Sequence, residues 1–209
     1  MIRLLGRHTS GNVQKVLFML EELGLAYVRE DYGRQFNNTN TEEYRKLNPT
    51  IKVPTLIDGE VVIWESNSIL RYLAAKHKPT LTGATPADKT YVERWMDWQL
   101  GALNTPYVAV FKDARKPAAE RSADFPAQSA DLIAQMKILE GHITGKSWFA
   151  LDRLTVADMC LAPIVKRCLE FPIEKPAFPE LSRWQKTIDA RPAFAVAIGS
   201  KPSALVSAA

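Results

Sequence analysis

The spacing of hydrophobic residues changes from one segment to the next over the first thirty positions, and each spacing predicts a different element. Residues 2–6 form a short apolar run of the kind found in strands. Residues 13–23 repeat apolar side chains at three- and four-residue intervals, which predicts a helix that ends at Gly24. Residues 26–31 alternate and predict a second strand. The chain therefore begins with a strand, a helix and a strand.

A polar stretch and then a hairpin complete the first part of the chain. Residues 33–50 are mostly polar, and we expect a loop there with a short helix over residues 42–47. Residues 52–64 are largely apolar and β-branched, with Pro54 near the start and an Asp-Gly turn in the middle, which predicts two paired strands. Ser66 is expected to be the N-cap of the helix that follows. This part of the chain is predicted to be α/β.

The pattern changes to helices alone after a linker rich in proline and threonine at residues 79–86. Thr85 and Asp88 have the spacing of a capping box, in which each side chain bonds the backbone of the other residue. Pro106 should kink or end the helix that begins there, because proline has no N–H to donate. Further helices are predicted over residues 127–143, 156–169 and 181–190, the second with a capping box of Thr155 and Asp158.

The linker divides the chain into two predicted domains. Residues 1–78 form the α/β domain and residues 86–209 form an all-helical domain. No apolar run approaches the length of a transmembrane helix. Residues 1–6 also lack the long apolar region and cleavage site of a secretion signal. These features predict a cytoplasmic protein with no membrane partner.

The charge of the chain is mildly basic, with a net charge of +4 and a pI near 9.0. The lysines and arginines are dispersed among acidic residues, which disfavours a nucleic-acid partner and suits small anionic ligands.

The two cysteines, Cys160 and Cys168, lie in one predicted helix and are expected to be small core residues. Eight residues of helix separate their Cα atoms by about 12 Å, which is too far for a disulfide. Neither has a Cys or His neighbour at the spacing of metal ligands, so we expect no metal.

Several segments, taken in order, resemble the cytosolic glutathione transferase superfamily. Residues 6–13 (Gly-Arg-His-Thr-Ser-Gly-Asn-Val) are similar to those of bacterial members related to the theta, zeta and nu classes. The resemblance covers essentially the whole chain and implies a thioredoxin-like domain followed by a helical domain. The other segments are Lys52-Val53-Pro54 before the hairpin, Glu65-Ser66 after it, and the Thr155/Asp158 capping box with Leu154 and Met159 beside it.

The resemblance implies that glutathione binds to the first domain. A cis Val53–Pro54 peptide would turn the Val53 N–H and C=O outward to pair with the extended tripeptide. Glu65 would accept from the γ-glutamyl ammonium, and Ser66 with the helix N–H groups would hold its carboxylate. The alternative is that Ser66 only caps the helix and Glu65 is a solvated turn residue. Two further contacts are implied, from Lys52 to the glycine carboxylate and from Phe36 to the cysteinyl or glycyl part.

The same resemblance places the thiol-activating group at the start of the first helix. Ser10 occupies the place of the catalytic serine of theta-like classes, Asn12 resembles an asparagine used in the nu class, and Thr9 is a second hydroxyl. The alternative is that these three residues only cap the helix. Neither a tyrosine nor a cysteine lies in this loop, which disfavours the tyrosine-dependent classes and a mixed-disulfide mechanism.

The electrophile would bind in a pocket that the helical domain helps to form. Tyr107 and Phe111 are candidate walls, although aromatic residues at this spacing also suit a core. Trp95 and Trp98 share a helix face and are expected to be packing residues.

The resulting hypothesis is a homodimeric glutathione transferase that joins glutathione to hydrophobic electrophiles in detoxification. Two alternatives remain open: a nu-like reductase of disulfides or peroxides that uses glutathione, and a binding protein that keeps the fold without the reaction. The identity of the second substrate also remains open, as does the question whether Ser10 or Asn12 dominates activation of the thiol.

Overall fold

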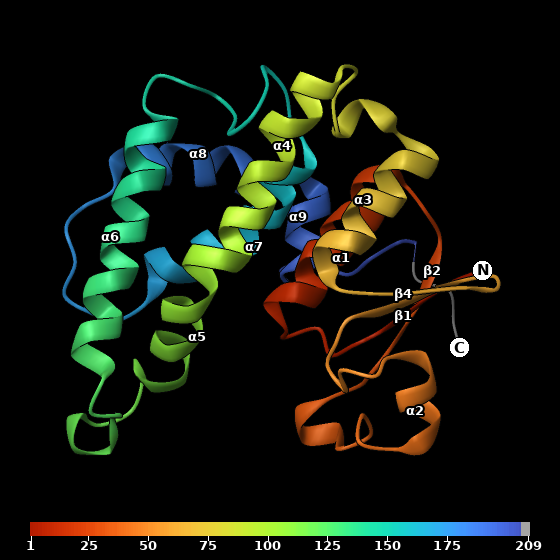
Figure 1. Ribbon diagram of the computed structural model, residues 1–209, viewed down its shortest axis with the longest axis horizontal. Coiled ribbons are helices and arrows are strands. Elements are labelled where there is room, and N and C mark those ends of the chain that lie inside the picture. Colours follow the sequence, from red (N-terminus) through yellow and green to blue (C-terminus); the bar gives the residue numbers. More distant parts are fainter. Residues whose placement is uncertain (206–209) are drawn as a thin grey trace. The chain divides into compact units, whose positions relative to one another are not determined.

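The computed structural model describes residues 1–205, which divide into two compact units (Figure 1). Unit 1 contains residues 1–81 together with the C-terminal residues from Asp189, and unit 2 contains residues 82–188. Unit 1 holds the strands and unit 2 is helical, so the predicted fold class is confirmed. The predicted domain bounds of 1–78 and 86–209 stay predictions.

The centre of unit 1 is a mixed sheet of four short strands with the order β2-β1-β3-β4. β1 pairs with β2 in parallel and with β3 antiparallel, and β3 and β4 form the predicted hairpin. Alternation and hairpin chemistry therefore located every strand of this sheet. The strands are β1 (Ile2–Leu5), β2 (Tyr27–Glu30), β3 (Thr55–Asp58) and β4 (Val61–Trp64).

Helices cover both faces of this sheet, with α1 and α3 on one side and α2 on the other (Figure 1). Helix α1 ends at Gly24, whose left-handed φ of 67° allows its N–H to reach the carbonyls of Leu20 and Glu21. The positions of all three helices agree with the sequence pattern. They are α1 (Gly11–Leu23), α2 (Glu42–Leu47) and α3 (Ser66–His77).

A helix that the sequence did not predict, α9 (Pro192–Ala197), packs against α1 in unit 1. The rings of Phe18 and Phe194 meet edge to face with their centroids 5.1 Å apart. Arg191, just before α9, pairs with the carboxylate of Glu22. Six residues are too few to show helical periodicity, so only the packing on α1 reveals this element.

Unit 2 is a bundle of helices in which the residues described contain no strand. A π-helical segment, Gln99–Leu103, separates α4 from α5, which carries Pro106 in its first turn. Proline cannot donate to the carbonyl four residues earlier and also crowds it, and the wider π turn accommodates both effects. None of the described helices is long and apolar enough to cross a membrane. The helices are α4 (Pro86–Trp98), α5 (Asn104–Asp113), α6 (Phe125–Ile143), α7 (Val156–Glu170) and α8 (Pro179–Asp189).

Both predicted capping boxes are present, and the one at α7 is completely buried. The carboxylate of Asp158 accepts the Thr155 N–H at 3.0 Å and the Thr155 hydroxyl at 3.1 Å. It also accepts the Phe149 N–H at 3.0 Å and the Trp184 Nε1–H at 3.2 Å. Burial raises the pKa of Asp158 to about 6, while these four donors act to lower it. This carboxylate therefore joins the start of α7 to α8 and to the segment before α7.

The two cysteines lie inside α7 as predicted, and neither forms a disulfide. Both are fully buried, and burial raises the pKa of the Cys168 thiol. They are core residues of unit 2.

Candidate functional site

Two neighbouring cavities in unit 1 bring together most of the predicted site residues. The first, the hairpin cavity, has a volume of about 50 Å³, and the second, the Ser10 cavity, has a volume of about 270 Å³. Asn12, Lys52 and Val53 line both, so the two cavities adjoin, and we refer to them together as the depression. Pro54, Glu65 and Ser66 line the hairpin cavity only, and Ser10 lines the Ser10 cavity only.

Ser10 lies at the N-cap position of α1, but its hydroxyl does not cap the helix. Its backbone is extended, with φ −82° and ψ 125°, and its carbonyl accepts the Gln14 N–H at 2.9 Å. The side chain makes no capping hydrogen bond and is 8% exposed. The capping alternative therefore does not account for this hydroxyl, which is left to face the cavity that it lines.

Ser66 and Asn12 join the first turns of α3 and α1. The Ser66 hydroxyl donates to Asn12 Oδ1 over 3.3 Å. The prediction that Ser66 is the N-cap of α3 was wrong, because Ser66 is the first helical residue. The N-cap is Glu65, with a φ of 69°. With its N-cap at the left-handed Glu65, α3 begins one residue earlier than expected. Two helix N-termini, which favour anions, thus adjoin one depression.

The backbone around the depression adopts conformations that are rare for residues other than glycine. Arg34, Ile51 and Glu65 have φ values of 44°, 54° and 69°, and all three line one of the two cavities. Each such residue costs about 1–3 kcal/mol, and the cost is greatest for a β-branched side chain such as that of Ile51. Residues of this kind gather at binding and catalytic sites. The strain marks this depression as the candidate functional site.

The Val53–Pro54 peptide is cis, as predicted. Within residues 1–205, the Val53 backbone makes no hydrogen bond, although it lines both cavities. An extended ligand can therefore pair with its N–H and C=O as an added strand would.

A buried polar network holds the loop that carries Val53, and the sequence reading missed it. The Tyr44 hydroxyl donates to the Lys52 carbonyl at 2.6 Å, and Asn48 Nδ2 donates to the same carbonyl at 2.9 Å. Both side chains also reach Thr55 Oγ1, at 2.9 and 3.0 Å. Asn48 is 1% exposed. No local signal distinguishes Asn48 from the other polar residues of the predicted loop.

We expect Asn48→Ala to destabilise the protein by about 2–3 kcal/mol, because it leaves the part-buried Lys52 carbonyl and the buried Thr55 hydroxyl with fewer partners. Urea denaturation followed by circular dichroism measures this free energy of unfolding. Asn40→Ala, at an exposed position, is the matched control and should change it by less than about 0.5 kcal/mol. Equal effects in the two variants would contradict a supporting role for Asn48.

The remaining predicted residues do not line the two cavities. Thr9 is exposed, and Phe36 is 39% exposed in a short 3₁₀ turn. Tyr107 is buried in unit 2, stacked against Phe171 with ring centroids 6.0 Å apart, and Phe111 lies beside both. Conversely, seven lining residues were not predicted: Arg7, Gly33, Arg34, Thr39, Asn48, Thr50 and Ile51.

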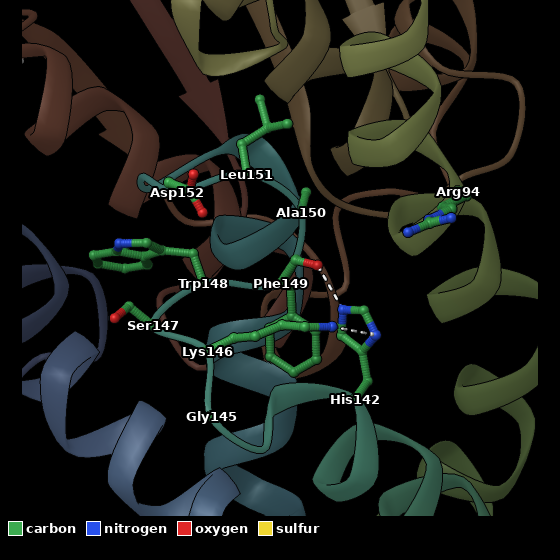
Figure 2. Close-up of a pocket in the computed structure, with 10 residues that line it drawn as sticks. All are labelled: Arg94, His142, Gly145, Lys146, Ser147, Trp148, Phe149, Ala150, Leu151 and Asp152. Carbon is green, nitrogen blue, oxygen red and sulfur yellow. Dashed lines mark hydrogen bonds between the residues drawn. The ribbon is translucent and has the colours of Figure 1, made fainter.

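A further cavity, of about 380 Å³, lies in unit 2 and contains none of the predicted site residues (Figure 2). Polar groups of its lining form hydrogen bonds with one another. His142 Nε2 bonds to the Phe149 carbonyl at 2.7 Å, and Lys146 Nζ lies 3.5 Å from His142 Nδ1. Burial lowers the pKa of His142, and the charges of Lys146 and Arg94 lower it further. Among the described residues no cluster of His, Cys, Asp and Glu could hold a metal.

Comparison with known proteins identifies family models and relatives that match this chain. Family models described as the N-terminal and C-terminal domains of glutathione S-transferase match residues 9–76 and 101–192. Glutathione S-transferase GstB of Escherichia coli K12 is 34% identical over 198 residues, which cover 92% of this chain and 95% of that protein. Glutathione S-transferase 4 of Zea mays is 29% identical over 201 residues, covering 92% and 89%.

Among solved structures, the theta class glutathione S-transferase of Xanthomonas axonopodis pv. citri with glutathione bound has a TM-score of 0.90. It is 34% identical, and the match covers 97% of this chain and 99% of that one.

Proposed function

Because the chain belongs to the glutathione S-transferase family, we propose that it binds reduced glutathione in the depression of unit 1 and joins the sulfur to an electrophilic carbon. The family assignment confirms the resemblance found in the sequence. The observation that carries the proposal is the meeting of Ser10, Val53 and Ser66 around one depression at two helix N-termini.

The hairpin cavity suits the γ-glutamyl end of the tripeptide. Ser66 is 3% exposed and begins α3, so its hydroxyl and the free N–H groups of the first turn can hold a carboxylate. Glu65 supplies the opposite charge for the γ-glutamyl ammonium. Val53 then pairs with the ligand backbone, and Lys52 extends toward the glycine carboxylate. In this arrangement each charged end of glutathione meets a complementary group.

The Ser10 hydroxyl activates the sulfur by donating a hydrogen bond to the thiolate. A free thiol has a pKa near 8.5, so only a few per cent is ionised at neutral pH. Lowering that pKa by about two units requires about 2.7 kcal/mol. One hydrogen bond to a charged group contributes about 1.5–3 kcal/mol, and the helix N-terminus adds about 0.3–1 kcal/mol. Asn12, bonded to Ser66, contributes by orienting groups of the site.

The second substrate is a hydrophobic electrophile with Tyr107 and Phe111 as candidate walls of its pocket. The thiolate attacks the electrophilic carbon and the leaving group departs, so that catalysis rests on proximity and on a stabilised thiolate. We further propose a cytoplasmic homodimer that detoxifies such compounds. The exposed apolar residues of the edge strand β4, Val61, Val62 and Trp64, are consistent with self-association.

The experiment combines calorimetric titration with glutathione and two assays of turnover. We expect saturable binding, and conjugation of 1-chloro-2,4-dinitrobenzene with release of chloride. Ser66→Ala should weaken glutathione binding by about tenfold or more, since it removes a hydrogen bond to a charged group. Ser182→Ala, an exposed serine on α8, is the matched control and should bind as the wild type does.

Each rival function has its own signature in the same experiment. Binding with turnover of a small disulfide alone would support the glutathione-dependent reductase. Binding without turnover of either substrate would support a non-catalytic binding protein. Folded protein that does not bind glutathione would overturn both enzyme functions.

A further inference from the structure

The Ser10 cavity carries positive charge on its wall. Arg7, Arg34 and Lys52 line it, and within the described part of the chain none of its lining residues is acidic. Protein walls of low dielectric weaken the screening of such charges by water, so an anion in the cavity is attracted strongly. The thiolate of the proposed reaction is such an anion.

Arg7 is tied to Ser10 by the backbone of the loop between β1 and α1. The Ser10 N–H donates to the Arg7 carbonyl at 3.1 Å. The Arg7 N–H in turn donates to the carbonyl of Tyr32, just beyond β2, at 3.0 Å. These bonds hold both residues against the same end of the sheet, so the position of Arg7 relative to Ser10 is set by the fold.

The guanidinium of Arg7 occupies space that a side chain at position 33 would take. A Cβ on Gly33 would lie 2.9 Å from Arg7 Nη1 and 3.4 Å from Val53 Cγ1. Gly33 also has a φ of 84°, a conformation that other residues rarely adopt. The absence of a side chain there lets the guanidinium lie beside Val53, the residue expected to pair with the ligand backbone.

A fixed charge in this place acts more strongly on the thiolate than a neutral donor does. An opposite charge within about 4–6 Å lowers the pKa of an acid by about 1–3 units. A guanidinium also keeps its charge at every pH at which the enzyme works. A guanidinium in contact with the sulfur would therefore supply what the Ser10 hydroxyl lacks, a full positive charge.

Building on the proposed function, we propose that Arg7 is a second catalytic residue, whose guanidinium contacts the glutathione sulfur and stabilises the thiolate together with the Ser10 hydroxyl. When the S–H bond breaks, its proton passes to water or buffer and its electron pair stays on sulfur. That pair then forms the C–S bond while the leaving group departs with its own pair. Arg7 exchanges no proton in these steps.

The test separates stabilisation of the thiolate from binding of the tripeptide. The ultraviolet absorbance of the thiolate, recorded against pH at saturating glutathione, measures the thiol pKa in the complex. Titration with S-methylglutathione, which cannot ionise at sulfur, measures binding alone. In Arg7→Gln we expect the thiol pKa to rise by about one unit or more, with less than about a threefold change in the Kd of S-methylglutathione.

Matched variants guard against general damage to the fold. Arg3→Gln removes another arginine, one paired with Glu30 across β1 and β2, and should behave as the wild type in both measurements. Arg7→Met also removes the charge and is expected to raise the thiol pKa by the same amount. It provides the test if Arg7→Gln does not fold.

An unchanged thiol pKa in the folded Arg7 variants would overturn the proposal. If those variants also bound S-methylglutathione more weakly, Arg7 would bind a carboxylate of the tripeptide and not its sulfur. A wild type that binds neither ligand would instead overturn the proposed function itself, and the role of Arg7 with it.

Discussion

Ser10→Ala is expected to lower the rate of conjugation at neutral pH by about 10- to 150-fold while leaving the protein folded. Ser10 is 8% exposed and its hydroxyl makes no capping bond, so the loss of the hydroxyl leaves α1 intact. What is lost is one hydrogen bond to a charged sulfur. The measurements are kcat/KM against pH and the thiol pKa of bound glutathione, which should rise toward its free value.

Two comparisons make this result specific to Ser10. Thr9→Ala removes the neighbouring hydroxyl, which is exposed and does not line the cavity. If Thr9→Ala lost the activity and Ser10→Ala kept it, Thr9 would be the thiolate donor. Ser182→Ala controls for the loss of a serine hydroxyl elsewhere and should retain wild-type activity.

Asp158→Ala is expected to lower the free energy of unfolding by more than about 3 kcal/mol, a large share of the total of about 5–15 kcal/mol. The change removes an N-terminal capping box. It also leaves the Phe149 N–H, the Thr155 N–H and the Trp184 indole N–H without their acceptor. Urea denaturation measures the loss, and the exposed Asp131→Ala on α6 is the matched control. A loss no greater than that of the control would show that the buried network contributes little.

Asp158→Asn tests the charge of the same side chain through pH. In the folded protein the pKa of Asp158 is about 6, above the value of about 3.9 in unfolded chains. Because folding raises this pKa, the protonated side chain stabilises the folded state at pH values below the unfolded pKa. That stabilisation is lost as the pH rises through about 6. The wild type should therefore lose about 2 kcal/mol relative to Asp158→Asn between pH 4 and pH 7. A difference independent of pH would contradict the raised pKa.

Local sequence signals located the elements because each depends on neighbours in the chain. Hydrophobic spacing located α1 and α3, and the paired Thr and Asp residues located the starts of α4 and α7. Helix α9 was missed because only its contact with α1 stabilises so short a segment. The cap of α3 was misplaced by one residue because the left-handed turn at Glu65 leaves no local mark in the sequence.

The same difference between local signals and tertiary contacts applies to the site. The sequence by itself indicated part of the candidate site, since Ser10, Asn12, Pro54, Glu65 and Ser66 follow from short motifs and from their resemblance to a family. Only the tertiary structure decided how those groups are held. The close approach of Gly33 and Arg7 depends on segments distant in the chain, and the burial of Asn48 and the positive φ of Ile51 have no local sequence signal. A motif specifies residue types at fixed spacing, whereas packing between β1, α1 and the hairpin determines which side chains face one cavity.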